Sequence, residues 1–316
     1  MVMLLTIGIP TKNSEKHIMY ALKSIARQIL PKDLEIEIVI VDGGSKDKTL
    51  KYINKGFHII KEFLGTKLTE TKILFENVGR IGYARNIIVM NSQGDWILWL
   101  DSDNIIEEYY IWKFWHTIYN SETDIAVIYP LRVIPIAKNL VSKAMTCYLY
   151  STLPQVSVNS HGEEQLSVTA MQGVFTRRNY ILDIGGFDNR LKAGEDIDLF
   201  LKLKRRGYIF KQFNGKLYAF LKESLRSLLH QAFTWNYYET IIRQTYNSER
   251  KIDEKIDLYQ DLLRIFKSYM FLVIYGGRWC STSQALLMHL LFILRKLSFY
   301  LGRRLAFYDY KRKYLR

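Results

Sequence analysis

The sequence predicts an α/β protein whose central sheet is parallel and doubly wound, followed by a helical region at the C-terminal end. Three observations predict it. Strand-like and helix-like runs alternate from residue 4 onward, as they do in proteins built from βαβ units. Several of these strands end in an acidic side chain. From Ser224 onward, strand-like runs vanish and helical patterns dominate.

The first two units set the pattern. A strand over 4–9 is followed by the turn 10–13 and by a helix whose apolar residues recur at helical spacing until Pro31 ends it. A second strand over 35–41 ends at Asp42, where the chain turns on two glycines into the next helix.

A third strand over 72–75 leads through a helix at about 82–91 to a strand over 96–100. This last strand is entirely apolar, which predicts burial on both faces. Asp101 and Asp103 follow it directly. Ligands of open α/β sheets bind beyond the carboxyl ends of the strands, and two carboxylates there suit a hard cation completed by phosphates. The alternative is an Asx-type turn.

A second acidic group begins a later helix. Glu195, Asp196 and Asp198 fall in its first turn, where the helix dipole favours negative charge. Because the ends of parallel strands meet at one edge of a sheet, Asp42 and both acidic groups can share a cleft. The structural alternatives are that Asp42 caps the helix after it and that the acids only complement the helix dipole.

The net charge of +14 is concentrated toward the C-terminal end. Residues 221–316 contain 17 Lys/Arg and 8 Asp/Glu, which predicts an anionic partner. Within this region, residues 285–307 form a basic amphipathic pattern that is typical of a helix on a membrane surface, whereas no apolar run is long enough for a membrane span. Cys147 and Cys280 lie far apart, which favours a reducing compartment and leaves a pairing between them open.

Several motifs occur in a fixed order along residues 4–210. They are Ile-Pro-Thr-Lys-Asn at 9–13, Val-Asp-Gly-Gly-Ser-Lys-Asp-Lys-Thr at 41–49, Asn-Val-Gly at 77–79 with Ala-Arg-Asn at 84–86, Asp-Ser-Asp at 101–103, Gly-Gly-Phe-Asp at 185–188 and Gly-Glu-Asp-Ile-Asp-Leu at 194–199. In this set and order, the chain resembles a family 2 glycosyltransferase of the GT-A fold, which has a Rossmann-like, mostly parallel central sheet with flanking helices.

The resemblance implies a nucleotide-diphospho-sugar donor, linked to GDP or UDP, in the first half of the domain. Asp42 matches the acid that hydrogen-bonds the nucleotide base beside the turn 10–13. The nucleotide-binding residues implied in this way are Pro10, Thr11, Asn13, Asp42, Arg80, Arg85, Asp101 and Ser102.

The resemblance also implies a metal, Mn²⁺ or Mg²⁺. Asp103 of the Asp-x-Asp motif would hold it against the diphosphate, and Asp101 would face the ribose or the outer shell of the metal. His230 is a further candidate for the diphosphate or the metal; the alternative is a packed or surface histidine.

Asp196 matches the catalytic base, with Glu195 beside it, and Gln172 and Gly173 border the acceptor by the same resemblance. The chemistry agrees, because a cation neutralises the leaving diphosphate and a carboxylate must take the proton of the weakly nucleophilic acceptor hydroxyl. A single base opposite the leaving group predicts inversion at the anomeric carbon.

We therefore expect a catalytic domain over 1–223, with a nucleotide-sugar half at about 1–104 and an acceptor half at about 105–223. The helical region 224–316 would associate with an anionic membrane. The expected reaction moves one hexose, such as mannose or glucose, to a glycolipid or lipid-linked oligosaccharide at the cytoplasmic face of the cell membrane, where the protein is peripheral.

Three alternatives remain open. A polyprenyl (dolichyl) phosphate sugar synthase is disfavoured because Asp103 is followed by Asn-Ile-Ile-Glu at 104–107. A non-catalytic nucleotide-sugar-binding protein is disfavoured because the acids are retained. A nucleic-acid partner is supported by charge alone, without an interleaved aromatic and basic motif, and none is expected.

Overall fold

The computed structural model describes residues 2–119, 121, 124–152, 170–246 and 282–314. The chain divides into two compact units, Met1–Ile134 with Ser167–Phe220 and Pro135–Leu166 with Leu221–Arg316. This division differs from the one predicted at residue 223, because Pro135–Leu166 is grouped with the C-terminal helices.

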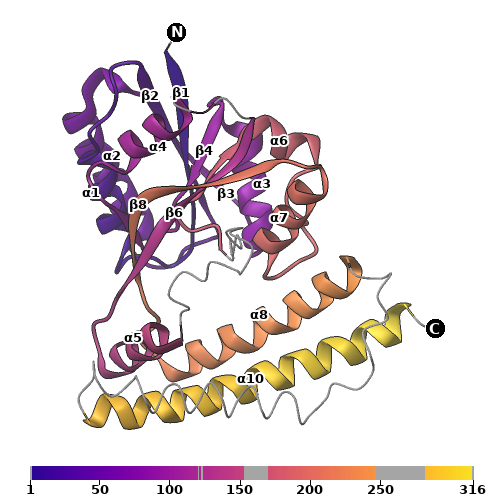
Figure 1. Cartoon of the computed structure of the whole chain (residues 1–316). Coiled ribbons are helices and arrows are strands. Elements are labelled where there is room, and N and C mark those ends of the chain that lie inside the picture. The colour runs from indigo at the N-terminus through magenta and orange to yellow at the C-terminus, as the bar shows by residue number, and fades with distance from the viewer. Residues whose placement is uncertain (1, 120, 122–123, 153–169, 247–281, 315–316) are drawn as a thin grey trace. The chain divides into compact units, whose positions relative to one another are not determined.

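The first unit begins with the predicted alternation of strands and helices (Figure 1). Its first four strands are β1 (Met3–Thr11), β2 (Leu34–Asp42), β3 (Leu68–Phe75) and β4 (Trp96–Trp99), and they pair in parallel. The helices between them are α1 (Ile18–Ala26), α2 (Thr49–Leu64) with the short 3₁₀ helix η1 (Gly65–Lys67), and α3 (Ile81–Asn91). This half of the sheet confirms the predicted α/β fold.

Beyond β4 the sheet becomes antiparallel. The strand order is β3-β2-β1-β4-β7-β6-β8-β5, in which the later strands are β5 (Asn104–Ile106), β6 (Ile125–Ile136), β7 (Phe175–Arg177) and β8 (Ile209–Phe220). β7 pairs antiparallel with both β4 and β6, and β5 pairs antiparallel with β8. The remaining helices of this unit are α4 (Tyr110–Tyr119), α6 (Arg178–Asp183) and α7 (Glu195–Arg205).

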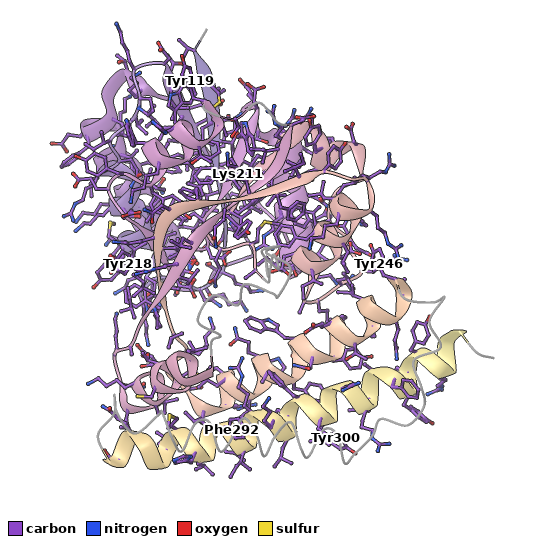
Figure 2. All side chains as sticks on the ribbon, in the orientation of Figure 1. Tyr119, Lys211, Tyr218, Tyr246, Phe292 and Tyr300 are labelled. Carbon is purple, nitrogen blue, oxygen red and sulfur yellow. The ribbon has the colours of Figure 1, made fainter. Side chains whose placement is uncertain are left out.

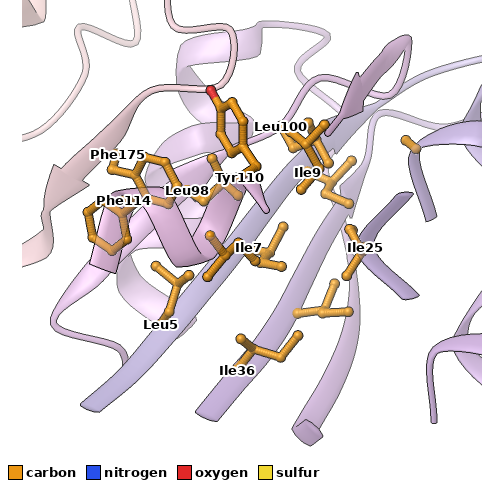
Figure 3. Close-up of a cluster of buried hydrophobic side chains, with 14 of the residues drawn as sticks. Leu5, Ile7, Ile9, Ile25, Ile36, Leu98, Leu100, Tyr110, Phe114 and Phe175 are labelled. Atoms are coloured by element: carbon orange, nitrogen blue, oxygen red, sulfur yellow. The ribbon is translucent and has the colours of Figure 1, made fainter. Parts of the chain in front are cut away.

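The core of the first unit lies against the central strands. β1 lies between β2 and β4, and its side chains Leu5, Ile7 and Ile9 are fully buried (Figure 3). On the antiparallel side, the rings of Phe114 and Phe175 stack with their centroids 3.8 Å apart. Phe175 lies opposite Leu98 of β4, so this packing supports the strand that precedes Asp101.

The second unit contains α5 (Leu140–Thr152), α8 (Leu225–Tyr246) and α10 (Thr282–Tyr314). Side chains of all three helices form one apolar cluster, whose buried members are Ala144, Met145, Cys147, Leu228, Met288, Leu291 and Phe292. This cluster explains why α5 belongs with the C-terminal helices. Cys147 is disulfide-bonded. This differs from the reduced state expected in a reducing compartment, which the wide spacing of the two cysteines favoured.

Candidate active site

Asp42 is the last residue of β2 and lies at the carboxyl ends of the parallel strands, beside Thr11 at the end of β1. The residue is 1% exposed, and its carboxylate accepts hydrogen bonds from the backbone N–H groups of Gly44 (3.1 Å) and Ser45 (2.8 Å). The Ser45 hydroxyl donates to the second oxygen over 2.5 Å. Asp42 therefore fixes the turn after its own strand. A carboxylate has about four acceptor positions, and hydrogen bonds from the described residues occupy three of them.

The turn after β1 is locked onto the turn after β2. Asn13 adopts a left-handed conformation (φ 48°), and its backbone N–H donates to Ser45 Oγ over 2.7 Å. The Lys46 N–H donates back to Asn13 Oδ1 over 2.9 Å. The hydroxyls of Ser14 and Ser102 are 2.7 Å apart, so the Asp-Ser-Asp segment joins the same group.

Two predicted nucleotide-binding residues lie on the last positions of β1. Pro10 is buried beside Val41. Thr11 is 6% exposed, and its hydroxyl has no hydrogen-bond partner among the described residues. An unsatisfied buried hydroxyl costs free energy, so a polar ligand at this turn would relieve that cost.

Glu76 is a further acid at this site, and it was not among the predicted site residues. It follows β3, and its carboxylate accepts the N–H groups of Val78 (2.7 Å) and Gly79 (2.8 Å). A Cβ at Gly43 would lie only 2.8 Å from Glu76 Oε1, so this glycine permits the close approach of two strand ends. The signal was present in the sequence, because Glu76 is an acid at a strand end like Asp42.

Asp101 and Asp103 follow β4 in a turn that the Asn104 N–H closes on the Asp101 carbonyl at 3.0 Å. The segment therefore forms a turn, as one interpretation of the sequence expected, and it also carries the two acids on which the metal-site interpretation depends. The Asp101 side chain is 22% exposed, and Asn104 donates to Asp103 Oδ1 over 3.3 Å.

Arg85 lies inside the protein, and its predicted nucleotide-binding role stays a prediction. It is 2% exposed, and its guanidinium pairs with Glu195 and with Asp101, the latter at 3.4 Å. The rings of Trp99 and Phe187 flank it, with centroids 6.0 and 5.8 Å from its Cζ. Arg85 thus joins the end of β4 to the start of α7.

Arg80 and Asn86 hold the loop that precedes α7. Arg80 Nη1 donates to the Asn189 carbonyl over 2.7 Å. The Asn86 amide donates to the Phe187 carbonyl over 2.8 Å and accepts the Phe187 N–H over 2.9 Å. A Cβ at Gly186 would lie 2.6 Å from Asn86 Oδ1. The Ala-Arg-Asn and Gly-Gly-Phe-Asp motifs therefore form one clasp that positions the acidic helix.

Glu195 and Asp196 occupy the first turn of α7. Burial raises the pKa of Glu195 to about 7, against the opposing charge of Arg85. Burial likewise raises the pKa of Asp196, while Arg85 and hydrogen bonds from the backbone of Ile197 and Met171 oppose the rise. A buried carboxylate with a raised pKa, such as Asp196, is suited to general-base chemistry.

Gly173 lies beside the end of β4. Its N–H donates to the Trp99 carbonyl over 2.8 Å, and its own carbonyl accepts the Tyr110 hydroxyl over 2.6 Å. With Gln172 before it and Met171 bonded to Asp196, this segment lies between the strand-end acids and α7. His230 is exposed on α8 in the second unit, and its role at a metal stays a prediction.

Comparison with known proteins agrees with this architecture. Residues 6–145 match the model of glycosyl transferase family 2. Over these residues the chain is therefore similar to family 2 glycosyltransferases. Over 100 residues it is 37% identical to poly(ribitol-phosphate) beta-N-acetylglucosaminyltransferase TarS of Staphylococcus aureus, which covers 32% of this chain and 16% of TarS. It is 28% identical over 207 residues to probable glycosyltransferase YdaM of Bacillus subtilis, which covers 65% of this chain and 47% of YdaM.

The solved structure of S. aureus TarS residues 1–349 with UDP-GlcNAc superimposes with a TM-score of 0.52 at 17% identity, covering 97% of this chain and 92% of that one. This likeness shows that the chain shares the fold of that structure, which agrees with the predicted GT-A fold. The matched regions cover less than half of the length of TarS and of YdaM.

The acidic side chains at the strand ends could supply only some of the ligands that a hard cation needs. Among the residues that the structure describes, no group of three or more His, Cys, Asp or Glu side chains could hold a metal. Asp101 pairs with Arg85 at 3.4 Å, and Asp103 Oδ1 accepts a hydrogen bond from the Asn104 amide over 3.3 Å, so both acids of the motif also have partners within the protein. Mg²⁺ and similar ions often take one or two carboxylates and complete their shell with substrate phosphates, so the residues fit a cation that arrives with a diphosphate.

Proposed function

We propose that the chain transfers a single sugar from a nucleotide-diphospho-sugar to an acceptor hydroxyl, with inversion at the anomeric carbon. One observation carries the proposal. Arg85 ties the strand-end acid Asp101 to Glu195, so the acidic start of α7 lies at the same edge of the sheet as the turns that end β1, β2 and β4. A donor leaving group and a proton acceptor can thus be held on one rigid frame.

In this reaction Asp196 takes the proton from the acceptor hydroxyl as its oxygen forms a bond to the anomeric carbon. The bond between that carbon and the diphosphate oxygen breaks, and the nucleoside diphosphate leaves with the electron pair. The N–H groups of Met171 and Ile197 orient the Asp196 carboxylate. Glu195 stays paired with Arg85 and fixes the helix turn instead of taking part in proton transfer.

The nucleotide would lie against the turns after β1, β2 and β3. Asp42 would accept an N–H of the base, and the Thr11 hydroxyl lies at the adjoining strand end. Mn²⁺ or Mg²⁺ bound through Asp103, with Asp101 nearby, would supply charge neutralisation for the diphosphate.

For the donor, a UDP-linked hexose or N-acetylhexosamine is favoured over a GDP-linked sugar. TarS has been solved with UDP-GlcNAc, and a further relative, 30% identical over 125 residues, is named poly(ribitol-phosphate) beta-glucosyltransferase of Bacillus spizizenii. The acceptor we propose bears phosphate, as a polyol-phosphate chain or a lipid-linked glycan does. The net charge of +14 supports an anionic acceptor.

The experiment is a transfer assay preceded by a thermal-shift screen of UDP- and GDP-sugars with Mn²⁺ or Mg²⁺. We expect a UDP-sugar to stabilise the protein most. Poly(ribitol phosphate), a glycolipid and a polyprenyl phosphate are then offered as acceptors in separate reactions.

Asp196→Asn should lower the transfer rate by about 10²–10⁴-fold and leave donor binding intact. Asp183→Asn, at an exposed position of α6, is the matched control. Full activity of Asp196→Asn would refute the assignment of the base. Donor binding without transfer or donor hydrolysis under any condition would instead favour a non-catalytic binding protein.

A further inference from the structure

One side of α10 exposes a continuous row of large apolar side chains. Each of the six is between 47 and 65% exposed: Leu290, Ile293, Leu297, Leu301, Leu305 and Tyr308. Their spacings of three or four residues place them on one side of the helix. We name these six residues the α10 stripe. At 1.5 Å per residue, the stripe is roughly 27 Å long.

The opposite side of α10 packs within the second unit. Met288, Phe292 and Ala306 are buried, and Phe292 is labelled in Figure 2. A Cβ at Gly302 would lie 2.6 Å from the Phe233 carbonyl, so α8 and α10 approach closely there. Within the part of the chain that the structure describes, α10 is thus apolar on two sides, and only one of them is covered.

The charge of α10 indicates what covers the other side. The helix sequence contains seven Lys/Arg and one Asp. Arg304 and Arg312 are exposed, and their spacing from Leu301 and Tyr308 places them on the same side as the stripe. A second copy of the helix would bring cations against cations, whereas anionic lipid phosphates would neutralise them.

The helix does not suit insertion across a bilayer. No helix among the described residues is long and apolar enough to cross a membrane. An exposed apolar row with cations along it is instead the pattern of a helix that lies in the headgroup region.

We propose that the α10 stripe lies on an anionic lipid bilayer, with the helix parallel to the membrane surface. The apolar side chains enter the boundary between headgroups and acyl chains, and Arg304 and Arg312 contact lipid phosphates. This inference does not depend on the proposed sugar transfer, because it concerns the second unit alone.

The test is co-sedimentation of the full chain with vesicles of phosphatidylcholine alone or of phosphatidylcholine with phosphatidylglycerol. We expect binding to the anionic vesicles. Leu297→Gln/Leu301→Gln should lower the partition coefficient by about tenfold or more, since two apolar side chains lose their burial. Arg304→Gln/Arg312→Gln should lower it by roughly 30-fold on anionic vesicles.

Matched controls lie on α2 of the first unit. Lys51→Gln/Lys55→Gln removes two exposed charges, and Phe63→Gln removes an exposed apolar side chain. These variants should bind vesicles like the wild type. Retained donor binding and an unchanged thermal midpoint will show that the stripe variants fold.

Three results would overturn the proposal. They are vesicle binding that the stripe variants leave unchanged, equal binding to neutral and anionic vesicles, and a wild-type dimer in solution that Leu297→Gln/Leu301→Gln dissociates. The last would identify a second copy of the chain as the occupant of the stripe.

Discussion

Replacing Arg85 by methionine removes the cation that lies between Asp101 and Glu195. Glu195 is 4% exposed, and burial already raises its pKa to about 7 although Arg85 lowers it. Without the guanidinium, the pKa of Glu195 rises further, and the pKa of Asp196 moves in the same direction. The cost of the substitution therefore depends on pH.

The stability lost in Arg85→Met grows with pH because the folded variant holds a proton on Glu195 that the folded wild type releases. Below about pH 7, Glu195 is protonated in the folded wild type and in Arg85→Met, so the pH-dependent part of the loss is small. Above pH 7 the wild-type carboxylate ionises beside its partner, whereas the variant must keep the proton. Each pH unit then adds about 1.4 kcal/mol to the loss, or about 3 kcal/mol by pH 9.

Urea unfolding of wild type and Arg85→Met between pH 6 and pH 9 measures this loss. Glu195→Gln and Arg85→Met/Glu195→Gln complete a double-mutant cycle, in which most of the pH dependence should vanish. Arg80→Met, at a partly exposed arginine that bonds a carbonyl, is the control. A loss for Arg85→Met that stays constant across this pH range would refute the account of the buried pair.

Three further predictions rest on close contacts. Gly43→Ala should displace Glu76, because a Cβ would lie 2.8 Å from its carboxylate, and should weaken donor binding by about tenfold in calorimetry with little loss of kcat. Glu37→Ala should lower the free energy of unfolding by about 3 kcal/mol, since this buried carboxylate accepts the Thr6 hydroxyl at 2.6 Å; an unchanged urea midpoint would contradict it. Phe114→Ala should cost about 3–5 kcal/mol in the same assay, because it removes a ring stacked on Phe175.

The parallel half of the sheet was predictable because its signals are local. The apolar run of β4 ends in two acids, and each earlier strand ends in a turn motif within a few residues. The antiparallel half was not predictable in this way. β7 is only three residues long, too short to show a period, and it is defined by pairing with β4 and β6 far away in sequence.

The same distinction applies to the site. The positions of Asp42, Asp101 and Asp196 followed from strand ends and a helix start. The burial of Arg85 did not, because the carboxylate that compensates its charge lies 110 residues away, in Glu195. Glu76 is an acid at a strand end, so the sequence pattern could have predicted it. The close approach of its carboxylate to Gly43, which leaves no room for a side chain there, could be seen only in the structure.

In the proposed reaction one carboxylate, Asp196, acts opposite the leaving diphosphate. The most direct measurement is the anomeric configuration of the first product, followed by proton NMR with an α-linked UDP-sugar as donor. We expect the wild type to form a β-linked product from the earliest time points and Asp196→Asn to form none. An α-linked first product would contradict the proposed reaction.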